Sequence, residues 1–381
     1  MHKVIFYPVG NGDTSQIILE NGKRLLFDFR HQLQGENEDH PVIDLKAQLY
    51  KELAEANRDY FDVVAFTHGD KDHIDRSIEF FELLHADKYQ GEGRVKIREL
   101  WVPAAMILET ATNGEQSNDF VIWRQEARYR LKQGKGIQVF SRPDKLKAWL
   151  EENGMTLESR SHLITDAGTL AKGFSIQNDE VEFFCHSPFS IHVDGQEDIQ
   201  RNEASLIFQI RFEIQGMQLN YMAIGDSQYN VLEDIIDISK YHDRGHRLDW
   251  DLLNIPHHCS WKALGPEKGE VETIPTDKIK ELLLHGQSNA YLVSSSNVIE
   301  NTEEGYSRDQ PPHIQAKNTY KKYLSEISGY GFLVTMEEPN TISPEPLVFE
   351  VSAYGLRRLA KASRGAAAII STPAPRAGSG R

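Results

Sequence analysis

The stretch FDVVAFTHGDKDHID (residues 61–75) joins a short apolar run to a cluster of polar side chains, and it decides the fold class. Residues 62–66 are mostly apolar and include two valines, which predicts a buried β-strand. Apolar residues recur at helical spacing over 74–86 and predict a helix. The polar cluster therefore lies in a loop between a buried strand and a helix, where α/β proteins place their functional sites.

Four side chains of this loop could bind a metal ion: His68, Asp70, Asp72 and His73. Neutral imidazoles and carboxylates are good ligands for zinc, manganese and iron. A loop allows side chains at positions i, i+2, i+4 and i+5 to converge, which a regular helix does not. An exposed polar turn is the alternative, but two histidines and two aspartates within six residues after a buried strand favour a metal site.

The bulk composition is that of a soluble globular protein. Of 381 residues, 39% are hydrophobic and 26% are charged, and the chain is long enough for a large core. The formal net charge of −15 disfavours a broad, non-specific grip on nucleic acid. It is compatible with a local basic patch or with metal-assisted chemistry on phosphate.

The sequence shows no pattern that indicates export or membrane insertion. The two cysteines, Cys185 and Cys259, give no disulfide framework. No apolar run approaches membrane-spanning length, and residues 1–3 lead directly into a strand pattern rather than a signal peptide. We therefore expect a cytoplasmic protein that does not bind membranes.

The first part of the chain reaches its polar loop through a hairpin and a helix. The hairpin is predicted over 15–19 and 24–29 around an Asn-Gly turn, and its second strand ends near Asp28. An amphipathic helix at 44–57 then leads to the buried strand and the His68 loop.

The second part repeats this order. A hairpin predicted over 204–212 and 217–224 ends in Asp226. A buried strand at 251–255 then ends in Pro256-His257-His258-Cys259-Ser260. Two halves of like order would bring both polar loops to one edge of a two-sheet sandwich.

Residues 1–355 are predicted to form one domain, with a mostly helical insertion at about 87–175. A solvated surface segment is the alternative interpretation of that insertion. Residues 332–336 and 347–351 are interpreted as a terminal hairpin. Residues 356–381 are rich in Ala, Ser, Pro, Gly and Arg, and we expect a disordered tail there.

Six short segments, in this order along the chain, resemble the metallo-β-lactamase superfamily. They are Val9-Gly10-Asn11-Gly12-Asp13, Leu25-Leu26-Phe27-Asp28, Thr67-His68-Gly69-Asp70-Lys71-Asp72-His73, Asn202-Glu203-Ala204-Ser205-Leu206, Gly225-Asp226 and Pro256-His257-His258-Cys259-Ser260. Within that superfamily the chain is most similar to the hydrolase domain of bacterial DNA-internalisation (competence) proteins. The resemblance implies an α/β (α+β) fold, a four-layer αββα sandwich, with a dinuclear site for two divalent metal ions, Zn²⁺ or Mn²⁺.

The resemblance also implies which side chains bind these ions. The predicted metal ligands are His68, Asp70, Asp72, His73, Asp226 and His257. His68 and Asp70 would bind the first ion, and Asp226 would bridge it to the second.

Asp72, His73 and one histidine of the late pair would bind the second ion. We favour His257 as that ligand and expect His258 to face the substrate, with the reverse assignment left open. Asp72 and His258 are thus the predicted catalytic residues. Asp72 would orient the attacking water and accept its proton.

The chain departs from the superfamily pattern at several positions near the site. Asp70 stands where the commoner loop has histidine, Cys259 stands where glycine is usual, and Asn202 or His186 lies near the place of a third histidine. Lys71, Lys262 and Asn202 are the residues predicted to bind the substrate.

These features together predict a metal-dependent hydrolase that uses a metal-activated water. The predicted activity is that of a phosphodiesterase or nuclease acting on nucleic acid or nucleotides, so the expected partner is a phosphate-containing substrate. Hydrolysis of another ester, a thioester or a lactam is one alternative. A non-catalytic metal-binding scaffold in a larger bacterial complex, with a protein partner, is the other. The sequence does not determine the oligomeric state.

Overall fold

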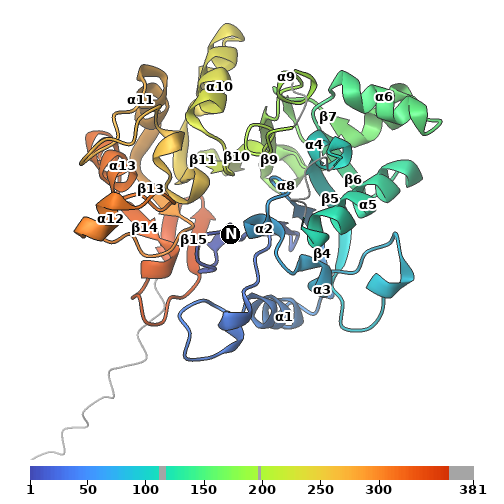
Figure 1. Cartoon of the computed structure of the whole chain (residues 1–381), viewed down its shortest axis with the longest axis horizontal. Coiled ribbons are helices and arrows are strands. Elements are labelled where there is room, and N and C mark those ends of the chain that lie inside the picture. The colour runs from blue at the N-terminus through green and yellow to red at the C-terminus, as the bar shows by residue number, and fades with distance from the viewer. Residues whose placement is uncertain (111–116, 196–198, 360–381) are drawn as a thin grey trace, which may run out of the picture.

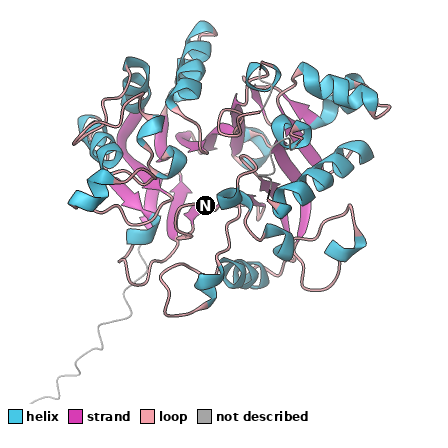
Figure 2. Cartoon of the chain, viewed as in Figure 1, coloured by secondary structure: helices cyan, strands magenta, loops and turns pink. Residues whose placement is uncertain are grey.

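Two β-sheets pack face to face in the computed structural model, which describes residues 1–110, 117–195 and 199–359. Helices cover the outer face of each sheet, so the strands occupy the middle of the molecule and the helices its flanks (Figure 1, Figure 2). The predicted mixed α/β fold with four layers in the order αββα is therefore confirmed.

The first sheet contains nine strands within the described residues, in the order β16-β15-β1-β2-β3-β4-β5-β6-β7. Their bounds are β1 His2–Phe6, β2 Ser15–Ile18, β3 Arg24–Phe27, β4 Tyr60–Ala65, β5 Lys96–Pro103, β6 Ile137–Phe140, β7 Ile164–Thr165, β15 Leu347–Ser352 and β16 Gly355–Leu359. Strands β1 to β3 are antiparallel, and β3 to β7 are parallel.

The second sheet contains seven strands in the described chain, in the order β14-β13-β12-β11-β10-β9-β8. Their bounds are β8 Thr169–Leu170, β9 Val181–Ser187, β10 Ile207–Ile214, β11 Met217–Ile224, β12 Trp250–Asn254, β13 Gly286–Ser294 and β14 Gly331–Val334. Strands β8 to β11 are antiparallel, and β11 to β14 are parallel. Each sheet thus has an antiparallel group and a parallel group, so the two halves of the chain share one order of strands.

The longer helices bury their apolar faces against the outer sides of the sheets (Figure 1). Those on the first sheet are α1 Leu45–Glu55, α5 Asn118–Gln133 and α6 Asp144–Glu152, and those on the second are α10 Tyr229–Tyr241, α11 Asp277–Leu284 and α13 Ile314–Glu326. Shorter helices are α2 Lys71–Ile74, α3 Ser77–Phe80, α4 Ala104–Leu108, α7 Leu157–Arg160, α8 Ile176–Asp179, α9 Ile191–Asp194 and α12 Glu303–Ser307.

Strand β4 shows why the first polar loop is held firmly. Val63 and Ala65 pack between the two sheets, whereas Val64 and Phe66 pack against the helices outside. Alternate side chains of a strand point to opposite faces, and both faces are covered here, so both sets are apolar. The strand therefore fixes the start of the loop at Thr67 from two sides.

Two sequence-based expectations were wrong. The helix expected over 74–86 is instead the two short helices α2 and α3, because Arg76 between them has a left-handed backbone (φ 59°) that ends helical geometry. The expected hairpin of 332–336 with 347–351 does not form, since β14 joins the second sheet and β15 pairs with β1 and β16 in the first.

Two of the predicted segments, the insertion and the tail, contain strands of the first sheet. Residues 87–175 contribute β5, β6 and β7 to the first sheet in addition to helices. Strand β16 includes residues 356–359 of the predicted tail, and residues 360–381 lie outside the described residues. None of the helices in the described chain is both long enough and apolar enough to span a membrane.

Candidate metal centre

The candidate ligands come together because they follow the carboxyl ends of strands in both sheets. Asp28 follows β3, His68 follows β4, Asp226 follows β11 and His258 follows β12. The carboxyl ends of parallel strands share one edge of a sheet, and that edge is where such folds bind ligands. The two loops predicted to converge do so.

Asp72, His73, Asp226 and His258 form a compact cluster, in which one nitrogen or oxygen from each lies within 4.8 Å of the others. The Nε2 atom of His73 is 3.3 Å from Oδ1 of Asp226. The Nε2 atom of His258 is 3.2 Å from Oδ2 of Asp72 and 3.5 Å from Oδ2 of Asp226. Two imidazoles and two carboxylates at these distances could hold a divalent cation.

His258 reaches the cluster through an unusual turn after β12. His257, His258 and Cys259 all have left-handed backbones, with φ of 51°, 52° and 66°. This conformation costs non-glycine residues roughly 1–2 kcal/mol each and persists where the surroundings enforce it. Nδ1 of His258 donates to the carbonyl oxygen of Ser295 at 3.0 Å, which leaves Nε2 to face the carboxylates.

His73 is oriented by Asp28, a buried residue to which the sequence analysis gave no role. Nδ1 of His73 donates to Oδ2 of Asp28 at 2.8 Å, and the Thr67 hydroxyl donates to the same oxygen at 2.6 Å. The Thr67 amide donates to Oδ1 at 2.7 Å. Asp28 therefore fixes both the His73 ring and the start of the loop. Asp28 directly follows β3, which pairs with β4, and this position at a strand end was the signal that could have identified it as a site residue.

Several buried polar atoms of the centre have no hydrogen-bond partner among the described residues. They are Nε2 of His68, Nε2 of His73 and Oδ1 of Asp226. Buried polar groups without partners are costly, and unmet imidazole nitrogen and carboxylate oxygen atoms are the donor types that zinc and manganese take. His73 and Asp226, which both belong to the cluster of four, therefore offer free donor atoms that fit a divalent metal ion.

The pKa shifts of the cluster residues also favour a bound cation. Burial lowers the pKa of His258, but the charges of Asp226 and Asp72 outweigh burial and raise it to about 10. Burial raises the pKa of Asp226, yet His258 and His73 hold it well below its usual range. The carboxylates thus require nearby positive charge, which a divalent ion provides while the imidazoles stay neutral.

His68 and His257 lie near Asp226, and Asp70 lies beside His68, but none of the three belongs to the cluster of four. Nε2 of His68 is 3.4 Å from Oδ2 of Asp70 and 3.9 Å from Oδ2 of Asp226. Nε2 of His257 is also 3.9 Å from Oδ2 of Asp226. The geometry thus groups His258, rather than the expected His257, with Asp72.

The predicted substrate-binding residues lie in different surroundings. Lys71 is exposed and lines a cavity that also includes Asp72. The Asn202 carbonyl accepts a hydrogen bond at 3.0 Å from Ser227, the residue after Asp226. Lys262 is exposed, with Nζ 5.9 Å from the centre of the neighbouring Trp261 ring.

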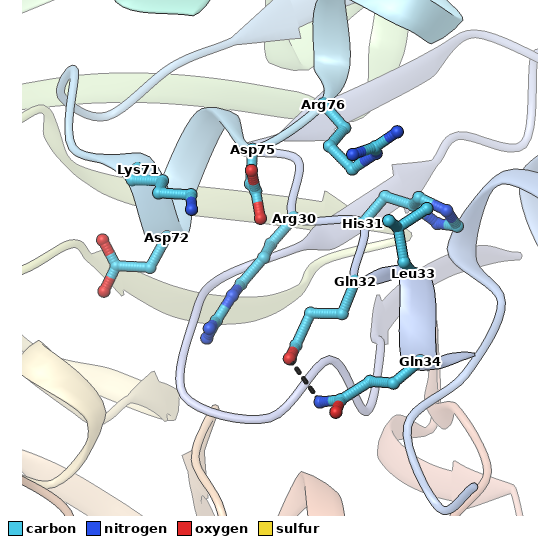
Figure 3. A pocket seen from close by; sticks show the side chains of 9 residues that line it. All are labelled: Arg30, His31, Gln32, Leu33, Gln34, Lys71, Asp72, Asp75 and Arg76. Atoms are coloured by element: carbon cyan, nitrogen blue, oxygen red, sulfur yellow. Dashed lines mark hydrogen bonds between the residues drawn. The ribbon is translucent and has the colours of Figure 1, made fainter. Parts of the chain in front are cut away.

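The cavity beside Asp72 has a volume of about 500 Å³ and is rich in cationic side chains (Figure 3). Its lining residues are Arg30, His31, Gln32, Leu33, Gln34, Lys71, Asp72, Asp75 and Arg76. Nε and Nη1 of Arg30 are buried without a hydrogen-bond partner in the described parts of the chain. Gly12 leaves room for Arg30, because a β-carbon there would collide with the arginine side chain.

No protein-family model matches the sequence, and no curated protein matches it. The fold is similar to solved structures of low sequence identity. The diiron β-hydroxylase CmlA from Streptomyces venezuelae is 11% identical over 87% of this chain and 52% of CmlA, with a TM-score of 0.39, so this chain spans about half the length of CmlA. A diphosphatase of the PhnP family is 13% identical over 92% and 98% of the two chains, with a TM-score of 0.32. The metallo-β-lactamase GOB-18 from Elizabethkingia meningoseptica is 12% identical over 84% and 86%, with a TM-score of 0.31. At this level of similarity, none of these proteins lends its activity to this chain.

Proposed function

We propose that this protein is a metal-dependent hydrolase whose metal ion is held by Asp72, His73, Asp226 and His258. The observation that carries the proposal is the convergence of these four buried or half-buried side chains from both sheets within 4.8 Å. A zinc or manganese ion held there would supply a Lewis acid for the activation of water and of the substrate's oxygen. The closer likeness to competence-protein hydrolase domains stays a prediction from the sequence motifs.

Backbone and side-chain groups around the centre fix its ligands. The carbonyl of Ser295 and the carboxylate of Asp28 fix the two imidazole rings. Asp72 borders both the cluster and the cavity, and this position supports the proposal that its carboxylate orients a water molecule and accepts its proton.

We propose a phosphodiester as the substrate, in a nucleotide or a short nucleic acid. The support is the cavity beside Asp72, where Arg30 has two buried nitrogens with no partner in the described chain and Lys71 lies nearby. Guanidinium groups bind phosphate through charge-assisted hydrogen bonds. Arg76 also lines the cavity but is paired with Glu79 at 2.8 Å. The net charge of −15 disfavours long duplex DNA.

A substrate screen tests this proposal. Protein reconstituted with zinc or manganese is expected to hydrolyse bis-p-nitrophenyl phosphate, single-stranded DNA, RNA or cyclic dinucleotides, and to leave a chromogenic lactam intact. Arg30→Ala should raise KM for the phosphodiester by about tenfold or more, because a hydrogen bond to a charged group contributes about 1.5–3 kcal/mol. The matched control is Arg308→Ala, which removes an ion pair with Glu300 instead. Lactam turnover with inert phosphodiesters would overturn the substrate assignment.

The two neighbouring histidines give a second test. His258→Ala should lose the metal ion, because Nε2 of His258 lies 3.2 Å from Asp72 and 3.5 Å from Asp226. His257→Ala should retain it, since the Nε2 atom of His257 is 3.9 Å from Asp226. Metal content per chain, measured by elemental analysis, distinguishes the two variants. The opposite pattern would restore the assignment favoured by the sequence, and metal retention in both would remove this loop from the site.

A further inference from the structure

The Arg201 side chain is fixed beside Asp70 by an unusually complete set of contacts. Its Nη1 donates to Oδ1 of Asp70 at 2.6 Å, and its Nη2 donates to Oε1 of Glu109 at 2.6 Å. Nε donates to Oε2 of Glu109 at 2.9 Å. Arg201 therefore joins two carboxylates through charge-assisted hydrogen bonds. One of the two, Asp70, belongs to the loop of predicted metal ligands.

Aromatic packing holds this guanidinium in place. It lies over the ring of Phe120, 4.5 Å from the ring centre, at the start of α5. The same ring packs on Gly69, where a β-carbon would collide with it. Gly69 immediately precedes Asp70, so Phe120 supports both partners of the ion pair. The side chain of Arg201 is 19% exposed, and its position is set by packing as well as by charge.

This arrangement disfavours a metal ion bound between His68 and Asp70. Arg201 donates to Oδ1 of Asp70, so an ion at Oδ2, the oxygen 3.4 Å from Nε2 of His68, would share the carboxylate with a guanidinium and be repelled by its positive charge. In the part of the chain that the structure describes, no group of three ligand side chains within 4.8 Å includes His68, Asp70 or His257. Asn202, near the expected third ligand, offers an amide rather than an imidazole.

We infer that the centre binds one metal ion and that Arg201, held by Glu109, provides the positive charge beside Asp70 that a second ion would otherwise supply. The inference rests on the proposed metal centre formed by Asp72, His73, Asp226 and His258. It replaces the sequence-based expectation of two ions. Arg201 acts as a positioning residue for Asp70 and for the loop.

Metal stoichiometry tests the inference without reference to activity. Zinc or manganese titration by calorimetry, with elemental analysis after gel filtration, should give one equivalent for the wild-type protein. Arg201→Ala should bind a second equivalent, because it leaves the carboxylates of Asp70 and Glu109 without their shared cation. The double variant Arg201→Ala/Asp70→Ala should return to one equivalent. Arg357→Ala, which removes an ion pair between an exposed arginine and Glu350, is the matched control and should stay at one.

The outcomes separate this inference from the proposed function. Two equivalents of similar affinity in the wild-type protein would overturn the inference and leave the metallohydrolase proposal standing. No bound metal in the wild-type protein would overturn both. A folded Arg201→Ala variant that still binds one equivalent would overturn the role of Arg201. The wild-type count decides between one ion and two even if that variant does not fold.

Discussion

Asp226→Ala is expected to abolish metal binding and to reduce hydrolysis by about a thousandfold or more, which corresponds to a loss of about 4 kcal/mol in transition-state stabilisation. Its carboxylate lies between the imidazoles, with Oδ1 3.3 Å from His73 and Oδ2 3.5 Å from His258. The side chain is buried, so its removal takes away the carboxylate that lies between the two imidazoles and leaves them only Asp28 and Asp72 as anionic partners. Elemental analysis and kcat/KM for a phosphodiester measure the two effects.

A surface aspartate provides the control for this variant. Asp237→Ala removes an exposed carboxylate that pairs with Lys278 at 2.6 Å, and it should change neither metal content nor kcat/KM. Retention of one metal equivalent by Asp226→Ala would place Asp226 outside the ligand set. The proposed ligand set would then be wrong at the residue that lies near both His73 and His258.

Asp28→Ala is expected to lower the free energy of unfolding by about 2–4 kcal/mol and to weaken metal binding by about 10–100-fold. The carboxylate accepts hydrogen bonds from His73 and from the hydroxyl and amide of Thr67, all at 2.8 Å or less. Without it these buried donors lose their acceptor, and the His73 ring loses the contact that fixes its orientation. Urea denaturation and metal titration measure the two quantities.

Two further variants separate orientation from stability. Asp28→Asn keeps the shape of the side chain but offers only one acceptor oxygen, so the affinity for metal should still fall. Asp179→Asn alters another buried carboxylate, whose partners include Asn21 and Lys23, and it should lower stability without changing metal affinity. Equal metal affinity for Asp28→Asn and the wild-type protein would show that Asp28 does not orient the ligand.

Local patterns in the sequence were sufficient to predict much of the fold. The apolar run of β4 and the Asn-Gly turn of the first hairpin act over a few residues, and both elements form as expected. The convergence of the His68 loop with the His258 loop was also predictable. Each loop follows a strand end, and the two halves share one order of strands.

Other features depend on contacts between distant parts of the chain. The choice between His257 and His258 follows from a left-handed turn and from the Ser295 carbonyl, neither of which has a signal in the local sequence. The strand β15 pairs with β1 at the opposite end of the chain rather than with β14. A hydrophobic pattern specifies that a strand is buried but not which neighbour buries it.

The sequence by itself predicted the two-sheet architecture, because periodicity and strand-end position are local properties, and its resemblance to a known superfamily implied the set of candidate ligands. Only the tertiary structure decided which of those ligands lie together in the cluster of four and that Asp70 pairs with Arg201 instead. Arg201 and Asp70 are 131 residues apart, and they meet where Glu109 binds the guanidinium and Phe120 packs on both the guanidinium and Gly69. Charge pairing acts through space at distances of a few ångströms, so the separation of residues along the chain carries no information about it.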